Sequence, residues 1–358
     1  MGSAPYAIIN FAALQHNLEQ VRTLTPNSRV MAVIKANGYG HGILRVARAL
    51  EAADALAVAR VDEGVALRQA GIVTPVVVLE GGIDQDELAL ASANKLELVV
   101  HNVEQISLLR QSPVAPITCW LKVDTGMHRL GVALDSAIGA YRELAACTAV
   151  VGQPRLMTHF ANADNLGDPT IPRQWHAIQP LAAELAVEVS CANSGGILGW
   201  PETHADWVRP GLMLYGVSPF TGGRAVGSGL QPVMSLHSRL IAVNHYSKGD
   251  AIGYGGTWIC PEDMAVGVVS IGYGDGYPRH AAAGTPVLIN DKLVPLVGRV
   301  SMDMISVDLR DCPAAQVNDT VTLWGAGLPV EEIAETADTI PYQLLCGVTA
   351  RVDFMEEM

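Results

Sequence analysis

Short apolar runs alternate with amphipathic stretches along the first two-thirds of the chain. After Asn10, a residue typical of a helix N-cap, apolar side chains recur at helical spacing as far as Leu24 and predict a helix. The run at 30–34 is continuous and rich in β-branched residues, as in strands buried on both faces. The same alternation predicts further strands at 55–59, 75–79, 96–100, 117–123, 155–157, 187–191 and 205–208.

Most of these strands are followed by a helical pattern, which implies parallel strands joined by right-handed crossovers. The helices are predicted at 62–70, 84–93, 103–110, 134–146 and 171–186. Periodicity alone leaves two α/β folds open, a closed (β/α)₈ TIM-type barrel and a doubly wound sheet. The barrel is favoured because the strands end in polar residues, which would meet at the catalytic rim of a barrel. These residues are Lys35, Arg60, Glu80, His101, Lys122, Asp124, His159, Asn193, Ser194 and Arg209.

The rhythm changes after Gly229, where short strands separated by turn signals replace the repeating units. Strands are predicted at 235–243, 265–271, 286–289, 293–297, 305–309 and 320–323, and helices at 330–337 and 342–346. We therefore expect a barrel domain over 1–229 and a mainly β-strand domain over 230–358. The glycine-rich segment 221–229 is interpreted as the linker, and a first strand at 6–10 could pair with the second domain.

Composition narrows the classes of protein further. The 358 residues are 49% hydrophobic and 16% charged, which is enough apolar material for a large core. The net charge of −13 disfavours nucleic acid or an anionic membrane as the partner. The apolar runs are of strand length, and the N-terminus lacks the pattern of a signal peptide. Scattered cysteines argue against a zinc or disulfide framework, so a cytoplasmic protein without a metal is expected.

The most informative stretch is 33–42, in which Lys35 ends a buried strand and several glycines follow. Burial lowers the pKa of a lysine, and the neutral amine is the nucleophile that forms Schiff bases with carbonyl compounds. Glycines allow backbone to approach a ligand closely. Taken alone, the stretch is better explained by a lysine whose ammonium reaches solvent before a turn.

This stretch does not stand alone, because further distinctive segments occur along nearly the whole chain. With the first, they are AVIKANGYGHG at 32–42, LKVDTGMHRLG at 121–131, THFANAD at 158–164, ANSGGIL at 192–198, DWVRPGLMLYG at 206–216, SIGYGDGYPR at 270–279, VGRVSMDMISVDL at 297–309 and PYQLLCGVTARV at 341–352. Together these segments resemble the bacterial alanine racemases, which use pyridoxal 5′-phosphate (PLP). The resemblance implies a PLP-binding barrel, a β-domain and a homodimer with shared active sites. It also implies interconversion of L- and D-alanine, which supplies D-alanine for peptidoglycan.

By this resemblance, Lys35 carries PLP as a Schiff base and is the base on one face of the substrate. Tyr273 of the partner subunit is the implied base on the other face. Arg209 matches the residue that faces the pyridine nitrogen; a guanidinium has no acceptor, so it does not favour a protonated pyridine. His159 matches a residue beside the PLP ring. The implied phosphate contacts are Tyr39, Ser194, Gly211, Leu212 and Tyr342.

The resemblance also assigns residues to the substrate. Arg129 matches an arginine that contacts the PLP phenolic oxygen and the substrate carboxylate. Lys122 matches a lysine that is carbamylated in many members and holds that arginine in place. Met302 and Asp303 match positions of the partner subunit around the substrate carboxylate and its small side-chain pocket.

Substrate choice stays open from the sequence. A broader-specificity or serine racemase of the same fold is the runner-up, because the volume of a pocket near Tyr39, Met302, Tyr254 and Tyr342 cannot be read from residues. Related PLP barrel decarboxylases for basic amino acids would lack the tyrosine of GYGDGYPR. A non-catalytic PLP carrier is the alternative from another class, and the β-rich domain and Tyr273 speak against it.

Overall fold

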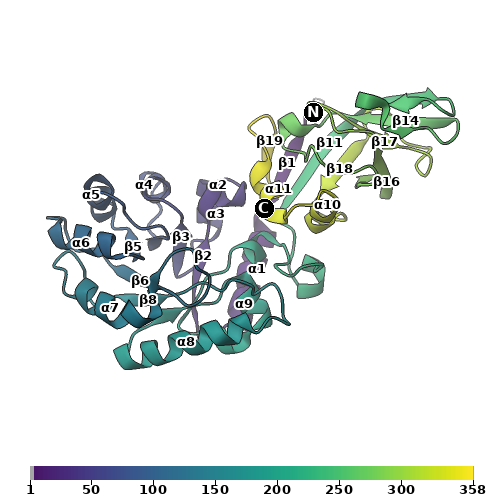
Figure 1. Ribbon diagram of the computed structural model, residues 1–358. Coiled ribbons are helices and arrows are strands. Elements are labelled where there is room, and N and C mark those ends of the chain that lie inside the picture. Colours follow the sequence, from purple (N-terminus) through teal and green to yellow (C-terminus); the bar gives the residue numbers. More distant parts are fainter. Residues whose placement is uncertain (1–3, 358) are drawn as a thin grey trace. The chain divides into compact units, whose positions relative to one another are not determined.

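The computed structural model describes residues 4–357, and the described chain forms two compact units (Figure 1). The barrel unit comprises 15–214 with 219–221, and the β unit comprises the chain up to Leu14, 215–218 and the chain from Gly222 onward. Helix α1 (Phe11–Leu24) begins in the β unit and continues into the barrel unit. Asn10 Oδ1 accepts the Ala13 backbone N–H at 2.7 Å and so provides the predicted N-cap.

The barrel unit contains a closed ring of parallel strands. Its members, in ring order, are β2 (Arg29–Val33), β3 (Ala55–Val58), β4 (Val76–Val78), β5 (Glu97–Val100), β6 (Cys119–Asp124), β8 (Arg155–Met157), β9 (Val189–Ser190) and β10 (Trp207–Val208). Strand β10 pairs with β2, and β5 pairs with β6, so the ring has no free edge. The predicted (β/α)₈ barrel is therefore confirmed, and the doubly wound sheet is excluded.

The helices predicted from apolar periodicity are present within a few residues of their predicted bounds. In the barrel unit they are α4 (Val61–Gln69), α5 (Gln85–Ala93), α6 (Val103–Gln111), α7 (Ala137–Ala145) and α8 (Thr170–Leu185). Helix α8 shows why the pattern is readable, because it buries Ile171, Gln174, Ile178 and Leu181 along one face. The short helices α3 (Ile43–Ala49) and α9 (Ser194–Gly199) were not predicted, since two turns are too few to show a helical period.

The β unit is a sheet that also closes on itself. Its order is β14 (Met264–Val269), β17 (Ile305–Asp308), β16 (Lys292–Val297), β15 (Pro286–Ile289), β18 (Thr320–Trp324) and β11 (Met234–Tyr246), and β11 pairs with β14. Strand β1 (Tyr6–Asn10) extends the sheet antiparallel to β11, and β19 (Asp353–Glu357) pairs with β1 in parallel. The two predicted helices are α10 (Val330–Thr336) and α11 (Pro341–Gly347).

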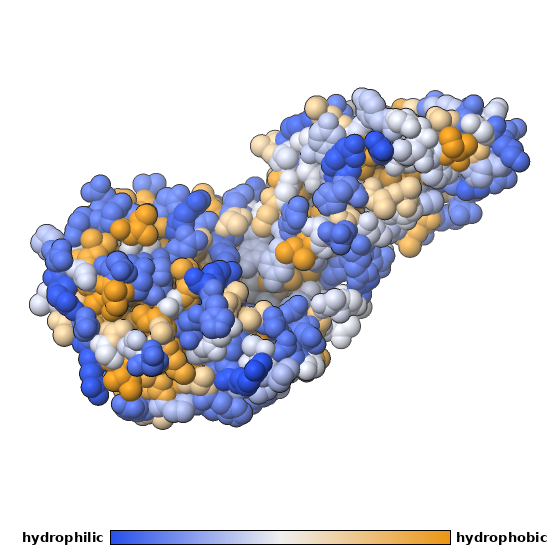
Figure 2. Space-filling view, in the orientation of Figure 1, coloured by the Kyte–Doolittle hydropathy of each residue, from blue (hydrophilic) through white to orange (hydrophobic). Residues whose placement is uncertain are grey.

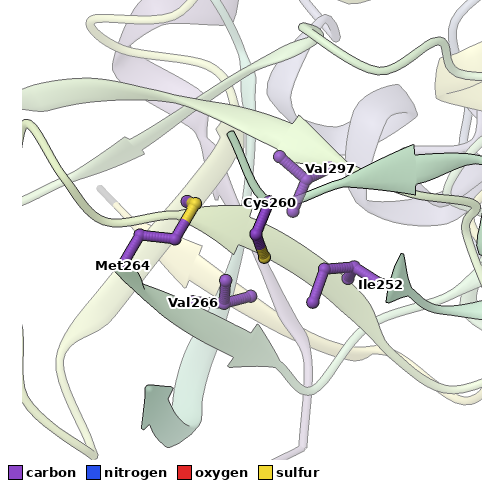
Figure 3. Close-up of a cluster of buried hydrophobic side chains, with 5 residues drawn as sticks. All are labelled: Ile252, Cys260, Met264, Val266 and Val297. Atoms are coloured by element: carbon purple, nitrogen blue, oxygen red, sulfur yellow. The ribbon is translucent and has the colours of Figure 1, made fainter. Parts of the chain in front are cut away.

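A small hairpin of β12 (Ala251–Ile252) and β13 (Trp258–Ile259) lies outside this sheet. Ile252 of this hairpin belongs to a buried cluster, drawn in Figure 3, with Cys260, with Met264 and Val266 of β14, and with Val297 of β16. Burial raises the pKa of the Cys260 thiol, which keeps it protonated and unreactive at neutral pH. The cluster therefore serves packing and not chemistry.

The outer surface of the chain is mixed in character. Figure 2 shows hydrophilic residues over most of the visible face, with hydrophobic residues in patches between them. Within residues 4–357, none of the helices combines the length and apolar character that crossing a bilayer requires.

Candidate active site

A cavity of about 490 Å³ opens at the C-terminal ends of the barrel strands. Several of the polar residues predicted at this rim line it together, namely Lys35, Glu80, His101, Lys122, His159 and Arg209. Arg129 joins them, and apolar side chains such as Val33, Leu79 and Met157 complete the wall. Arg60 is absent from this lining; its Nε lies 3.6 Å from Asp62 Oδ1 on the exposed surface. The strand-end pattern thus located the cavity, although not every member belongs to it.

Cations dominate the lining. Among the described residues that line the cavity, Glu80 is the only carboxylate beside the lysines and arginines. Burial lowers the pKa of Lys122 to about 8, and the positive charges of Arg209 and Arg129 add to this effect. Burial and then Arg129 also lower the pKa of Lys35, although Glu80 opposes them. Cations that depress one another's pKa form a strong site for an anion, and a neutral lysine amine is a nucleophile.

Arg209 is 4% exposed and is held by the ends of neighbouring strands. It donates to Ser190 Oγ at 2.6 Å, to the carbonyl of Cys191 at 3.2 Å and to the carbonyl of Thr158. Burial lowers the pKa of Arg209 to about 10, so it remains charged at neutral pH. Its Nη2 also lies 3.4 Å from His159 Nδ1. Burial and Arg209 hold the pKa of His159 well below its usual value, so this imidazole is neutral and Nδ1 accepts.

A second group of predicted residues meets where the last barrel strand ends. Ser194 Oγ accepts the backbone N–H of Gly211 at 3.0 Å and that of Met213 at 3.2 Å, with Leu212 between them. A Cβ at position 211 would lie 2.5 Å from Tyr39 Oη, so any larger residue there would displace the Tyr39 hydroxyl. Tyr39, Ser194, Gly211 and Leu212 therefore form one cradle of hydroxyl and amide groups, which suits a phosphate.

Arg129 lies on a loop that one carboxylate organises. Asp124 Oδ1 accepts three successive backbone N–H groups, those of 126–128, at 2.9 to 3.1 Å. Its Oδ2 lies 3.2 Å from His128 Nδ1. At the far end of the loop, a Cβ on Gly131 would lie 2.5 Å from the Asp124 backbone nitrogen, so the two chain segments touch. The loop is closed at both ends, which limits where the Arg129 guanidinium can go.

The remaining predicted residues lie in the β unit, and two of their segments meet. The Tyr273 backbone N–H donates to the carbonyl of Ser301 at 3.1 Å, and that of Gly274 donates to the carbonyl of Met302 at 2.9 Å. Tyr273, Met302 and Asp303 are therefore neighbours, although they lie about 30 positions apart in the chain. Tyr342 lies in the first turn of α11 and is 38% exposed.

Arg351 joins the same two segments and was not singled out in the sequence. Its Nη2 lies 2.7 Å from Asp303 Oδ1, and its Nε lies 3.1 Å from the buried Asp275 Oδ1. Asp275 in turn accepts the Gly272 backbone N–H at 2.9 Å, which shapes the turn that carries Tyr273. Arg351 belongs to the segment PYQLLCGVTARV. Its partners Asp275 and Asp303 lie 76 and 48 positions earlier in the chain, so no pattern of neighbouring residues could predict these ion pairs. The same holds for Glu63, whose contacts are described below.

Comparison with known proteins places these features in a family. The family models for the alanine racemase N-terminal domain and C-terminal domain match residues 9–219 and 233–355. The alanine racemase of Nitrosococcus oceani is 54% identical over 349 residues, which cover 97% of this chain and 98% of that protein. That of Aeromonas hydrophila is 50% identical over 354 residues, with 99% of each protein covered.

Solved structures agree with these relatives. The biosynthetic alanine racemase from Pseudomonas aeruginosa superposes with a TM-score of 0.96 at 40% identity, covering 100% of both chains. The alanine racemase from Bartonella henselae, solved with covalently bound pyridoxal phosphate, has a TM-score of 0.90 at 26% identity and covers 99% of this chain and 100% of that one. The similarity therefore extends over both units of the chain.

Proposed function

The chain belongs to the alanine racemase family, and on this premise we propose that it interconverts L- and D-alanine with PLP bound at Lys35. The observation that carries the proposal is the cavity at the barrel rim. There, a lysine with a lowered pKa lies among further cations and beside a cradle of hydroxyl and amide groups. The product D-alanine would supply peptidoglycan synthesis in the cytoplasm.

The residues of the barrel unit fit this cofactor. PLP is an anion with a phosphate and a phenolic oxygen, and a cavity lined mainly by cations suits its charge, while a lysine with a lowered pKa suits its aldehyde. We assign the phosphate to the cradle of Tyr39, Ser194, Gly211 and Leu212, with Tyr342 as a further contact. When bound, PLP supplies an electron sink for the Cα electron pair of the substrate.

Arg209 and His159 tune this site. Arg209 is buried and charged, and its contacts with Ser190 and Thr158 fix its guanidinium in place. A guanidinium can donate a hydrogen bond to the pyridine nitrogen but cannot accept one from a protonated pyridine. The pyridine therefore stays unprotonated, which keeps the electron sink weak and limits side reactions. His159 accepts from Arg209 and lies along the cavity wall, where we place it beside the cofactor ring.

Racemisation needs a proton carrier on each face of the substrate Cα. We assign Lys35 Nζ to one face, since burial among cations lowers its pKa and so favours the neutral amine, the form that accepts a proton. We assign the Tyr273 hydroxyl to the other face. Arg129 binds the substrate carboxylate, and Met302 and Asp303 of the partner subunit close the small pocket around it.

These assignments imply a homodimer with shared active sites. Lys35 lies in the barrel unit, whereas Tyr273, Met302 and Tyr342 lie in the β unit, where they are 40%, 53% and 38% exposed. Exposed large apolar side chains that gather near one another are typical of interaction surfaces. A head-to-tail dimer would bring Tyr273 of the partner subunit to the Lys35 cavity.

Lys122 is assigned a supporting role at the same site. Carbamylation requires a neutral amine, and burial beside Arg209 and Arg129 lowers the pKa of Lys122 to about 8. A carbamate there would carry a negative charge that pairs with Arg129. If Lys122 is carbamylated, adding bicarbonate should raise the activity of the wild-type enzyme. The activity of Lys122→Met should not change.

Chemical trapping tests the central assignment. Borohydride reduction of the cofactor-loaded enzyme, followed by peptide mapping, should place a pyridoxyl group on Lys35. A label on another lysine would overturn the assignment. A panel of small L-amino acids then tests the substrate, and faster turnover of serine than of alanine would favour the broader racemase.

Exchange of the Cα proton tests the two-base assignment. Tyr273→Phe keeps the ring and removes the phenolic proton carrier, so racemisation should fall by roughly 10²–10⁴-fold. The variant should still exchange deuterium into one enantiomer of alanine, the one that Lys35 reaches. Equal loss from both enantiomers, with the cofactor retained, would contradict separate bases.

Subunit mixing tests the shared site. A heterodimer of Lys35→Ala and Tyr273→Phe subunits contains one site with both residues intact, so mixing should restore part of the activity. If heterodimers form without any rescue, Tyr273 acts within its own chain.

A further inference from the structure

The segment that follows Lys35 has an unusual backbone. Ala36, Asn37, Gly38 and Tyr39 adopt left-handed φ values of 54°, 55°, 62° and 51° in succession, within the element labelled α2 (Lys35–Tyr39) in Figure 1. Left-handed turns are unfavourable for L-residues, and such strain persists only where the surroundings enforce it. Lys35 and Tyr39 are the two end residues of this turn. The contacts that hold the turn in its left-handed conformation therefore also fix the positions of Lys35 and Tyr39.

Glu63, in helix α4, contacts the beginning of this turn. Its Oε1 accepts the backbone N–H of Ala36, the residue after Lys35, at 2.8 Å. Its Oε2 accepts the backbone N–H of Ala59 at 2.7 Å and that of Arg60 at 3.3 Å, where strand β3 has ended. One carboxylate therefore caps α4 and ties the left-handed turn to the neighbouring strand end.

Other side chains support the turn from within its own segment. Asn37 Oδ1 accepts the Ile43 backbone N–H at 3.0 Å. His41 Nδ1 lies 3.1 Å from the Gly38 carbonyl and 2.9 Å from the Tyr39 carbonyl. Glu63 differs from these because it belongs to another element, so it fixes where the turn stands in the barrel as well as its shape.

The charge of Glu63 also reaches Lys35. Burial is the main cause that lowers the pKa of Lys35, and the charges of Arg129 and Arg209 act in the same direction. Glu80 and Glu63 raise it. Lys122 and His159 face the same lysine from strand β6 and from the end of β8. A neutral residue at position 63 should therefore leave Lys35 with a still lower pKa.

We propose that Glu63 is a positioning residue of this site, whose carboxylate holds the left-handed turn between Lys35 and Tyr39 and whose charge opposes the cations around Lys35. The proposal rests on the proposed function only in taking Lys35 as the reactive amine. Glu63 itself touches backbone groups and acts through Lys35.

Two substitutions separate its geometric and electrostatic roles. Glu63→Gln keeps the length of the side chain but loses the charge and replaces one acceptor with a donor that faces an N–H group. Glu63→Asp keeps the charge but is one methylene shorter, so it cannot span Ala36 and Ala59. Glu87→Gln is the matched control, because Glu87 accepts the Ile83 N–H at 2.9 Å at the start of α5 and so makes a similar local cap.

The first measurement is the pH dependence of Lys35 acetylation in the full-length chain freed of cofactor, followed by peptide mass spectrometry. Glu63→Gln should move the midpoint to lower pH, whereas Glu63→Asp and Glu87→Gln should leave it near the wild-type value. This measurement reports on the amine and does not depend on racemase activity. If the protein proved not to racemise alanine, the acetylation midpoints would still test the effect of Glu63 on Lys35.

The second measurement is kcat/KM for the cofactor-loaded enzyme, together with the Tm of each variant. Displaced catalytic groups cost on the order of 10- to 100-fold in rate, so both Glu63 variants should lose kcat/KM on that scale. Glu87→Gln should lose Tm without losing kcat/KM. If Glu63→Gln behaves like Glu87→Gln in both the acetylation midpoint and kcat/KM, Glu63 is only a helix cap and the proposal is wrong.

Discussion

The two ends of the barrel differ in how their charged side chains are arranged, with ion pairs at one end and a cluster of cations at the other. At the N-terminal ends of the strands, a basal cluster consists of Arg29, Glu97, Trp120, Arg155, Glu188 and Trp207. Its indole rings meet edge to face with centroids 5.5 Å apart. The Arg155 guanidinium lies 5.1 Å from the Trp120 centroid and 5.6 Å from that of Trp207.

Each charge of the basal cluster has a partner. Arg155 lies 3.1 Å from Glu97 and 2.9 Å from Glu188, and Glu188 also pairs with Arg29. The indole N–H groups of Trp120 and Trp207 donate to Glu97 and Glu188 at 2.8 and 3.0 Å. Buried or half-buried charges that are paired and hydrogen-bonded in this way contribute to a stable structure.

The rim cluster of Lys35, Lys122, Arg129 and Arg209 lacks this balance. Burial and the charges of Arg129 and Arg209 lower the pKa values of Lys35 and Lys122, and Glu80 is the carboxylate that lines the cavity with them. Repulsion among these cations lowers the free energy of unfolding of the ligand-free protein, and a bound anion would offset that repulsion. The barrel thus pairs its charges at the end where they contribute to stability and gathers cations of one sign at the end where we propose that it binds the cofactor.

The largest expected effect is that of Lys35→Ala at the rim. Loss of the amine to which we assign the cofactor and one proton transfer should reduce racemisation by at least about 10⁴-fold. Because the lysine stands among like charges, the cofactor-free variant should be no less stable than the wild type. Racemisation rates and thermal unfolding of both proteins check this. Activity within tenfold of the wild type would remove Lys35 from the mechanism.

Lys122→Met should raise the stability of the cofactor-free protein in bicarbonate-free buffer. The folded pKa of Lys122, about 8, lies below the unfolded value of 10.5, so the unfolded chain binds more protons between these pH values. The penalty is therefore full below about pH 8 and fades as the pH rises towards 10.5. We expect a gain of up to about 3 kcal/mol at pH 7. Urea unfolding at pH 7 and 10 measures it, and a loss at pH 7 would contradict the comparison.

Arg155→Met should have the opposite outcome at the basal cluster. It keeps much of the packing on the indole rings but leaves Glu97 and Glu188 without one cation. Because these side chains are partly exposed, we expect a loss of about 2 kcal/mol in the free energy of unfolding, below that of a fully buried pair. Racemisation at 25 °C should stay within about twofold. A variant with normal stability and impaired turnover would show that the basal cluster also serves catalysis.

The smallest effect is expected from Asp124→Asn, which loosens the loop of Arg129 and removes a charge that makes a minor contribution to raising the pKa of Lys122. A neutral acceptor bonds the 126–128 amides more weakly than a carboxylate, by about 1 kcal/mol. The KM for alanine should therefore rise about fivefold with little change in kcat. Asp84→Asn is the control, because Asp84 makes a similar contact with the Glu87 N–H at 2.8 Å, at the start of α5. A similar rise in KM for both variants would rule out a specific role for Asp124.

Local chemistry explains which parts of the fold could be predicted. The apolar strand runs and the amphipathic helix 171–186 depend on neighbours a few positions away, so their pattern is visible in the chain. Motifs such as AVIKANGYGHG and SIGYGDGYPR identified candidate site residues by resemblance to a family. Their catalytic roles remain predictions. What the structure adds is that Lys35, Lys122, Arg129 and Arg209 gather at one cavity.

Contacts across the chain explain the rest. The alternation of strands and helices, the position of Lys35 at a strand end and the family to which the motifs point can all be read from the residues in order. The folded chain was needed to see that β10 closes the barrel on β2, that Arg351 bridges Asp275 and Asp303, and that Glu63 accepts the Ala36 N–H beside Lys35. These contacts join residues 27 to 178 positions apart. Which residues meet in these contacts depends on how whole helices and strands pack together. The residues on either side of each contact therefore show no periodic pattern that would predict it.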